Sequence, residues 1–249
     1  MVDAAPSGAA FPAFASRPAS GLARPAIPRE GCAVPSPAPR IAVIDYGAGN
    51  LRSVAKALVR SGLAPRITSD PAVVRDARGV VLPGAGAFAK AIEQLDAKGL
   101  SDAIRESIAA GRPYLGLCLG LQLLFEESDE HGHSRGLCVL PGRVQRFGAR
   151  GEDGQPRCVP HIGWNEVRFD GKHPLCAALP TRDYFYFVHS YHVVPTRDSL
   201  CAGRCDYGGW FTAAAAQENI FAVQFHPEKS QAAGKRLLDA FANWMTSCA

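Results

Sequence analysis

The sequence has no long, uninterrupted run of apolar residues, and its longest runs are too short to span a bilayer. It also has no dense cluster of Lys and Arg that would concentrate the formal net charge of +4, so a nucleic-acid surface is not indicated. The 8 cysteines follow no regular disulfide spacing, which predicts a reduced, cytoplasmic protein. These absences argue against a membrane protein, a nucleic-acid-binding protein and a disulfide scaffold.

The first 39 residues have no apolar period. Pro and Ala account for 19 of them, and 8 of the 19 prolines of the chain lie there. Such a segment cannot bury enough surface to order itself, so residues 1–39 are predicted to be a disordered extension. The basic start and apolar core of a secretory signal are missing. An organellar transit peptide and a misassigned upstream start codon both remain open, because three arginines there face only two acidic residues.

From residue 40 the pattern becomes one of alternating strands and helices. Apolar residues at 51, 54, 55, 58 and 59 follow one face of a helix that ends near Gly62. Asp70 and Pro71 are typical of the N-cap and first turn of another helix. Strands that alternate with helices imply parallel pairing. We expect strands at 41–45, 66–69, 79–82 and 114–117, and helices at 88–98, 101–110 and 119–127.

Beyond about residue 137 the chain is mostly β-like. We expect strands at 144–147, 164–169, 184–194, 210–216 and 220–225, with a hairpin turn at 217–219. Ser230 is predicted to cap a closing helix that places Leu237, Leu238, Phe241 and Trp244 on one face. No internal repeat and no linker follow residue 40. One three-layer α/β domain of residues 40–249, with a mixed sheet, is the simplest interpretation.

The segment Gly-Leu-Cys-Leu-Gly at 116–120 lies between an expected strand and an expected helix. This is the pattern of a nucleophile elbow, in which larger side chains at the flanking positions would clash with a strained turn. Cys118 would stand at the N-terminus of helix 119–127, whose dipole favours the thiolate. The Leu119 N–H would be free to bind an oxyanion. A buried packing cysteine is the alternative, but the strand–turn–helix context favours a nucleophile.

A cysteine nucleophile needs a general base that a third group orients. His226 follows a β-like run, and Glu228 lies two residues later, with Pro227 stiffening the pair. Because residues i and i+2 of an extended chain point the same way, the carboxylate can reach the imidazole and fix its tautomer. Taken alone, this segment would rather be a surface turn at a strand end.

Other candidate ligands have weaker contexts. His131 and His133 lie in a polar loop without further identifiable metal ligands, so we interpret them as solvated. For His189 two interpretations stay open: it faces the site, or it has a role in the core or at an interface. Cys201 and Cys205 have no second ligand pair and are interpreted as structural. We expect neither a metal nor a cofactor.

Two segments together resemble the class I (triad) glutamine amidotransferases. Residues 116–122 (GLCLGLQ) resemble the nucleophile segment of that family, and residues 223–230 (VQFHPEKS) resemble its His-Pro-Glu segment. Their order and their separation of about 110 residues are also those of the family. The resemblance implies a three-layer, flavodoxin-like α/β fold with a mixed, largely parallel central sheet. It also implies glutamine hydrolysis by Cys118, His226 and Glu228 through a glutamyl thioester.

The resemblance assigns further roles. The oxyanion strand of the family matches residues 83–86, so the amides of Ala85 and Leu119 would form the oxyanion hole. Glutamine would be held near Gly86, Gln122, Ser190 and Tyr191. Gln122 lies at i+4 from Cys118 and would face the same mouth. Ala85 and Ala222 stand where relatives can carry Val or Gly, and neither departure removes a functional group.

Within this class, other segments resemble the glutaminase subunits of imidazole glycerol phosphate synthase, of histidine biosynthesis: residues 44–51, 83–88, 159–165 and 186–191. The resemblance covers about residues 40–247. It implies a heterodimer with a (β/α)8 cyclase subunit that receives the ammonia, because 249 residues cannot hold both modules. The cyclase would make imidazole glycerol phosphate and an aminoimidazole carboxamide ribonucleotide. The residues at the implied interface are Trp164, Asn165, Tyr186 and Lys229, and for Trp164 a place in the strand core is the alternative.

Three other functions remain to be weighed. The first is the glutaminase of an anthranilate, aminodeoxychorismate or guanine nucleotide synthase, against which residues 45–50 and 159–165 argue. The second is a non-catalytic module of this fold, which would be marked by loss of a triad residue, and all three are present. The third is a stand-alone thiol hydrolase or peptidase, which would be active without a partner.

Overall fold

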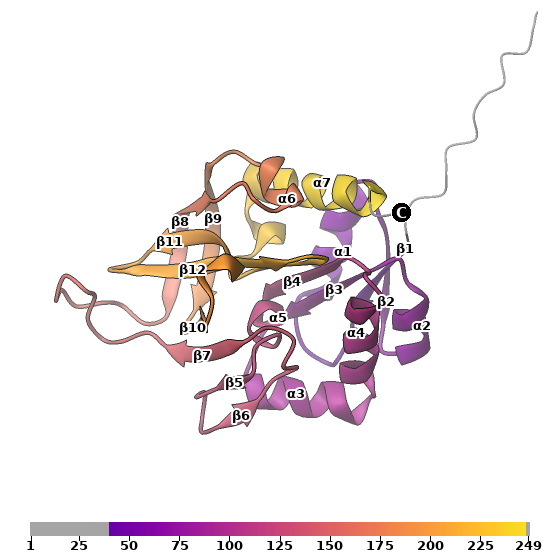
Figure 1. The fold of residues 1–249 in the computed structure, drawn as a ribbon, viewed down its shortest axis with the longest axis horizontal. Helices are drawn as coiled ribbons and strands as arrows, with labels where there is room; N and C mark the ends of the chain where they lie inside the picture. The colour runs from indigo at the N-terminus through magenta and orange to yellow at the C-terminus, as the bar shows by residue number, and fades with distance from the viewer. Residues whose placement is uncertain (1–39, 248–249) are drawn as a thin grey trace, which may run out of the picture. The chain divides into compact units, whose positions relative to one another are not determined.

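The computed structural model describes residues 40–247, so the prediction for residues 1–39 lies outside the described part. The centre of the domain is a parallel sheet whose strands run in the order β2, β1, β3, β4 and β13 (Figure 1). Short connections would favour antiparallel pairing, and helices between the strands are what permit parallel pairing here. These strands are β2 (Ala64–Thr68), β1 (Arg40–Ile44), β3 (Gly79–Gly84), β4 (Tyr114–Cys118) and β13 (Ile220–Val223).

The sheet continues beyond β13 with mostly antiparallel strands. The order from β13 is β12, β10, β7, β5 and β6, and a branch of β11, β8 and β9 leaves the sheet at β12. Only β5 and β7 pair in parallel in this half. The strands are β12 (Trp210–Gln217), β10 (Tyr191–Pro195), β7 (Gly142–Arg146), β5 (Glu127–Ser128), β6 (Ser134–Arg135), β11 (Cys201–Asp206), β8 (His161–Phe169) and β9 (Arg182–His189).

Alternating side chains of the parallel strands divide the interior into two cores. Ile41 and Val43 of β1 belong to the core under α1 (Leu51–Arg60), α6 (Pro174–Ala177) and α7 (Gln231–Ser247). Their neighbours Ala42 and Ile44 belong to the core under α2 (Pro71–Asp76), α3 (Phe88–Ala97) and α4 (Leu100–Ala109). Successive strand residues point to opposite faces, and helices cover both faces (Figure 1). The three-layer α/β fold with a mixed sheet is therefore confirmed.

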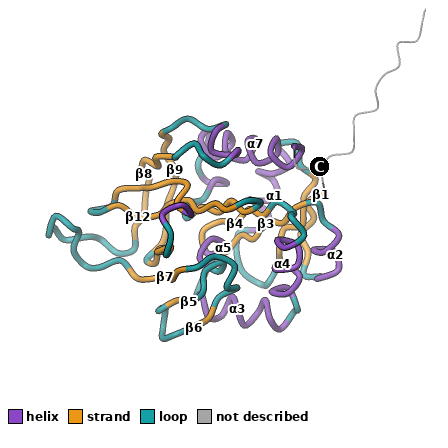
Figure 2. The backbone as a smooth tube through the Cα atoms, viewed as in Figure 1, coloured by secondary structure: helices purple, strands orange, loops and turns teal. Residues whose placement is uncertain are grey.

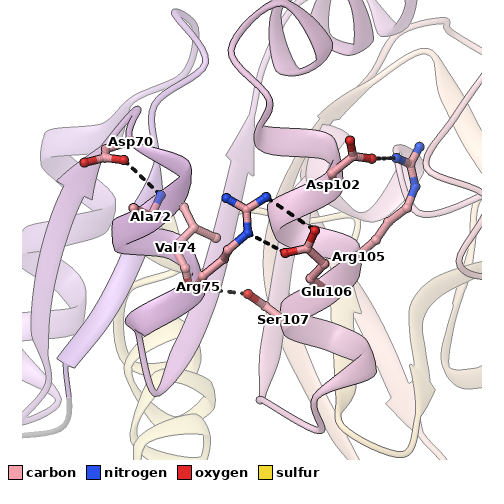
Figure 3. A network of polar contacts seen from close by, with 8 residues as sticks. All are labelled: Asp70, Ala72, Val74, Arg75, Asp102, Arg105, Glu106 and Ser107. Atoms are coloured by element: carbon pink, nitrogen blue, oxygen red, sulfur yellow. Dashed lines mark hydrogen bonds and ion pairs between the residues drawn. The ribbon is translucent and has the colours of Figure 1, made fainter.

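Helices α2 and α4 are tied together at the surface by polar contacts (Figure 3). Asp70 caps α2 by accepting a hydrogen bond from the Ala72 N–H at 2.9 Å, as the sequence predicts. Arg75 pairs with Glu106, and the Ser107 hydroxyl donates to the Val74 carbonyl at 3.3 Å. An exposed ion pair of this kind contributes little stability, so the buried apolar contacts hold the two helices together.

The helix expected at 119–127 is wrong in length. Helix α5 spans only Leu119–Gln122, and the chain then runs as a loop to β5 (Figure 2). The Leu123 carbonyl accepts the N–H of Leu137 at 2.8 Å, and the Leu124 carbonyl accepts the N–H of Val139 at 2.9 Å. These carbonyls are thereby paired with a distant segment, and the turn-type hydrogen bonds along the chain end with the one from the Phe125 N–H to the Gln122 carbonyl.

Two other local predictions need correction. The expected strand 184–194 is two strands, β9 and β10, which are separated at Ser190. Ser230 does stand before α7, but its hydroxyl does not cap the helix. That hydroxyl accepts the Tyr186 N–H at 3.0 Å and donates to the His226 carbonyl at 2.6 Å. The hairpin turn at 217–219 and the buried face of α7 are as predicted.

Candidate active site

Cys118 stands at a sharp turn between β4 and α5. Its φ of 53° and ψ of −105° lie where residues with a side chain are strained. A Cβ added at Gly116 would lie 2.6 Å from the Gly120 carbonyl oxygen, and one added at Gly120 would overlap the Leu82 carbonyl of β3. The two flanking glycines are therefore required for packing, as the elbow pattern predicts, and the turn places the thiol at the end of the parallel strands.

His226 and Glu228 follow β13, the strand that pairs with β4. Glu228 lies in a short 3-10 helix, η2 (Pro227–Lys229), and its Oε1 is 2.9 Å from the His226 Nδ1. The backbone N–H of His226 donates to the Tyr186 carbonyl at 2.9 Å, and this hydrogen bond holds the turn against β9. The side chains of the pair are only 10% and 3% exposed. The structure thus brings together the three predicted catalytic residues.

The charge of His226 is set by its two partners. Burial lowers its pKa, but hydrogen bonds with the Cys118 thiol and the Glu228 carboxylate outweigh burial and raise the pKa from 6.5 to about 9. The imidazole is therefore protonated at neutral pH. Helix α5 has a single turn, so the dipole argument for the Cys118 thiolate is weakened. The His226 imidazolium stands beside the Cys118 sulfur.

A cavity of about 390 Å³ opens beside the Cys118 sulfur. It contains the predicted catalytic Cys118 and His226, and every residue predicted from the sequence for the oxyanion hole and for glutamine binding lines it. The lining includes Ala85, Gly86, Leu119, Gln122, Ser190 and Tyr191. Because these positions come from four separate parts of the chain, their convergence is a property of the fold.

Strand β3 delivers the predicted oxyanion segment to the nucleophile. Gly84 pairs with Cys118 in the register of β3 and β4, so Ala85 follows directly beside the thiol. The phenol of Tyr46 packs under this segment, where burial raises its pKa to about 12 although the Ala85 N–H lowers it. Ala85 and Leu119, the two residues predicted to supply the oxyanion donors, both line the cavity beside Cys118.

Buried glutamines support the cavity wall. Gln122 donates through Nε2 to the Tyr191 carbonyl at 3.0 Å and to the Gln224 Oε1 at 3.1 Å. Gln224 is fully buried, and its Nε2 donates to the Cys118 sulfur at 3.6 Å. No sequence pattern predicted a role for Gln224. Its spacing of two residues from His226 on an extended chain was the available signal.

Glu130 is a second residue that sequence reasoning missed. It lies in the loop between β5 and β6 and lines the cavity. Its Oε2 accepts the N–H of Phe88, at the start of α3, at 2.6 Å. Helix α3 has no side-chain cap of its own, so this carboxylate takes the capping role. A fixed carboxylate in the cavity can bind a cationic group of a ligand.

Of the residues predicted for a protein interface, Trp164 and Tyr186 lie on the outer face of β8 and β9, and Lys229 lies beside them in η2. Trp164 is 47% exposed and meets Tyr186 edge-on, with ring centroids 6.2 Å apart. The Lys229 ammonium lies 5.9 Å from the Tyr186 ring centre. Asn165 instead turns inward and donates to the Asp206 carbonyl at 2.9 Å. We call the outer face of Ile162, Trp164, Tyr184 and Tyr186, with Lys229 at its edge, the aromatic patch.

The structure also locates the other histidines and cysteines that the sequence offered as candidate ligands. Residues 40–247 contain no group of three or more potential metal ligands, and His131 and His133 lie in the β5–β6 loop. Cys201 and Cys205 are buried free thiols of β11. His189 is buried and lines the cavity, so the site-facing alternative holds for it. Across the described range, we find no helix with the length and apolar character needed to cross a membrane.

Comparison with known proteins gives one family. The model of the class-I glutamine amidotransferase family matches residues 42–244. The HisH subunit of imidazole glycerol phosphate synthase from Syntrophotalea carbinolica is 50% identical over 204 residues, which are 82% of this chain and 99% of that protein. The HisH subunit from Aromatoleum aromaticum is 50% identical over 209 residues, with 82% and 98% covered.

Solved structures agree on the fold. The structure of PurLQS from Thermotoga maritima matches with a TM-score of 0.64 at 17% identity, covering 83% of this chain and 99% of that one. The crystal structure of a glutamine amidotransferase matches with a TM-score of 0.65 at 18% identity, covering 83% of this chain and 98% of that one. At such low sequence identity these matches show the fold alone, and they confirm the predicted fold class.

Proposed function

Because the chain belongs to the class-I glutamine amidotransferases, and among them to the HisH subunits of imidazole glycerol phosphate synthase, we propose that it is the glutaminase of that synthase. It hydrolyses glutamine to glutamate and ammonia, and a cyclase subunit uses the ammonia in histidine biosynthesis. The proposal includes a cytoplasmic location. The observation that carries it is the hydrogen-bonded line of Cys118, His226 and Glu228 at the wall of one cavity.

The proposed reaction uses the charge state of the triad. The Cys118 thiolate attacks the side-chain amide carbon of glutamine, and the tetrahedral oxyanion is bound by the amides of Ala85 and Leu119. The His226 imidazolium gives its proton to the leaving nitrogen, so ammonia departs and a glutamyl thioester remains. His226 then takes a proton from water as the water attacks the thioester. Glutamate leaves and the thiolate is restored, while Glu228 holds the imidazole throughout.

The cavity wall offers matching groups for the backbone end of glutamine. The Glu130 carboxylate would pair with the α-ammonium group, since it is the acidic side chain among the cavity-lining residues. Gln122 has both hydrogens of its amide engaged by the protein, which leaves its Oε1 as an acceptor for the substrate. Residues Gly86, Ser190 and Tyr191 would supply the remaining contacts from the backbone and side chains of the wall.

The aromatic patch is the proposed docking surface for the cyclase subunit, in a heterodimer. Ile162, Trp164 and Tyr184 are 59%, 47% and 57% exposed, and large apolar side chains grouped in this way are typical of interfaces. The patch lies next to the cavity, because Lys229 borders both. A (β/α)8 cyclase docked there would cover the cavity mouth and receive ammonia before it picks up a proton from bulk water.

The test is glutamate release from glutamine by the purified chain, alone and with a cyclase subunit and its nucleotide ligand. We expect slow release alone and a steep rise in the complex, since the oxyanion segment 83–86 has glycine at two of four positions. Cys118→Ala should abolish glutamine-dependent turnover while the complex still uses added ammonium salts. Fast release that ignores the partner would exclude the synthase role, and loss of the ammonium-dependent reaction would assign Cys118 to folding or docking.

A further inference from the structure

Two buried histidines form a hydrogen-bonded line that starts in the cavity wall, at His189, and continues behind it to His161. His161 begins β8 and His189 ends β9, and the two are direct partners in the antiparallel register. The His161 Nδ1 is 3.0 Å from the His189 Nε2, and the His189 Nδ1 is 2.8 Å from the Tyr191 carbonyl oxygen. At the other end, the Asn165 Nδ2 is 3.4 Å from the His161 Nε2. The triad uses neither histidine.

The position of each hydrogen along this line can be inferred from the one group that can only accept. The Tyr191 carbonyl only accepts, so the His189 Nδ1 must carry a hydrogen. A neutral imidazole has one N–H, so the His189 Nε2 accepts and the His161 Nδ1 donates to it. The His161 Nε2 then accepts from the Asn165 amide. Burial lowers the pKa of His189 to about 3 and that of His161 to about 4, so both rings are neutral at pH 7, as this assignment requires.

The line ends on the segment that faces the ligand cavity. The Tyr191 carbonyl accepts hydrogen bonds from the His189 ring and from the Gln122 amide, at 2.8 and 3.0 Å. Ser190 and Tyr191 connect β9 to β10 and line the cavity, so this carbonyl fixes the wall from two sides. If the His189 hydrogen moved to Nε2, the carbonyl would face a lone pair and lose one of its two donors.

We propose that His161 is a positioning residue for glutamine binding: its N–H acts together with the Tyr191 carbonyl to fix the tautomer of His189, and His189 thereby holds the Ser190–Tyr191 wall in its binding geometry. The inference rests on the proposed function for the identity of the ligand. Neither histidine exchanges a proton with the substrate. The ring of a neighbouring histidine selects the tautomer, as second-shell partners do for metal-bound imidazoles.

Aromatic packing around His161 allows a clean substitution. Its ring stacks on Phe187 at 4.7 Å and on Tyr207 at 3.9 Å between centroids. His161→Phe keeps this stacking and removes both hydrogen bonds. His161→Gln keeps an N–H donor for His189 and an acceptor for Asn165. The buried His173 lies outside the cavity lining, so His173→Phe is a control for the loss of a buried, hydrogen-bonded histidine.

The experiment measures KM for glutamine and kcat in the complex with the cyclase subunit, and the tautomer of His189 by ¹⁵N NMR of the full chain. We expect His161→Phe to raise KM about five- to tenfold, the effect of one hydrogen bond, with kcat nearly unchanged. His161→Gln should recover most of this loss, and His173→Phe should lower stability without changing KM. Wild-type His189 should carry its hydrogen on Nδ1, with a fraction moving to Nε2 in His161→Phe.

The proposal is overturned by an Nε2–H tautomer of His189 in the wild type, by an unchanged KM in folded His161→Phe, or by equal KM values for the Phe and Gln variants. The wild-type spectrum tests the His189 tautomer even if a variant does not fold. If the complex releases no glutamate from glutamine, the proposed function fails. The tautomer measurement still tests the hydrogen-bonded line in that case, so the two failures are distinguishable.

Discussion

Replacing Cys118 with alanine should return His226 to an ordinary titration. In the intact site, the pKa of His226 is raised from 6.5 to about 9, although burial by itself lowers it. The hydrogen bond with Cys118 is the largest of the effects that raise this pKa, and that with Glu228 comes next. Without the thiol, Glu228 is left to oppose burial. We therefore expect the pKa of His226 in Cys118→Ala to fall by about 2 units, to near its ordinary value.

The rise in the pKa of His226 can be expressed as a free energy. A rise in pKa from 6.5 to about 9 corresponds to about 3 kcal/mol in favour of the imidazolium, at 1.36 kcal/mol per pH unit. Because the folded-state pKa is the higher one, this contribution to stability is complete below pH 6.5 and is lost as the pH rises through about 9. The wild type should therefore lose stability at alkaline pH, and Cys118→Ala should lose much less.

The assay is NMR titration of the imidazole signals between pH 5 and 10, with His226 identified by its absence in His226→Asn. Denaturant unfolding at pH 7 and pH 9.5 measures the linked stability. A pKa that stays near 9 in Cys118→Ala would show that Glu228 alone holds the charge. A wild-type pKa near 6.5 would refute the thiolate–imidazolium pair. The same proton leaves with ammonia, so kcat/KM for glutamine should decline above about pH 9.

Other substitutions test the cavity and the turn. Glu130→Gln should lower kcat/KM for glutamine about ten- to a hundredfold, the effect of losing a charged hydrogen bond, while Glu127→Gln, at a half-exposed position outside the cavity lining, should leave the steady-state kinetics unchanged. Ser230→Ala leaves the Tyr186 N–H without its acceptor and removes one of the two donors to the His226 carbonyl, so it should cost about 1–3 kcal/mol in urea unfolding. The buried Ser101 hydroxyl has no partner within residues 40–247, so Ser101→Ala should cost far less. Gly120→Ala should prevent folding into the native elbow, seen as loss of the cooperative unfolding transition. Little change in any of the three variants Glu130→Gln, Ser230→Ala and Gly120→Ala would contradict the role given to that residue.

Short-range patterns were sufficient for the elbow and for the His-Pro-Glu turn. The glycines at 116 and 120, the strand before Cys118 and the two-residue spacing of His226 and Glu228 are all local in sequence. The two segments meet in one cavity because β4 and β13 pair in parallel. Alternating strands and helices predict parallel pairing, but they do not predict which strands are neighbours or in which register they pair. The assignments of oxyanion and glutamine-binding residues came from resemblance to the family, and they remain predictions.

Long-range hydrogen bonds account for what the sequence could not predict. The apolar run after Gln122 has the composition of a helix, but its carbonyls are taken by residues 137–140. Glu130 lies one loop further on, between β5 and β6, and lines the cavity from there. The contact of His161 with His189 depends on the register of β8 and β9. None of these partners is close in sequence, so no periodic pattern indicates them.

The protonation states of the buried histidines at the site depend on their hydrogen-bond partners more than on how deeply they are buried. Burial is the largest effect on the pKa of His226 and of His189, and in both cases it favours the neutral ring. His226 faces a thiol and a carboxylate, which reverse the outcome, whereas His189 faces a carbonyl and a neutral ring. One cation therefore stands beside Cys118, where the leaving nitrogen needs a proton. A second cation at His189 would repel it, because His226 already lowers the pKa of His189. Keeping His189 neutral preserves both the charge needed for chemistry and the hydrogen bond that shapes the wall.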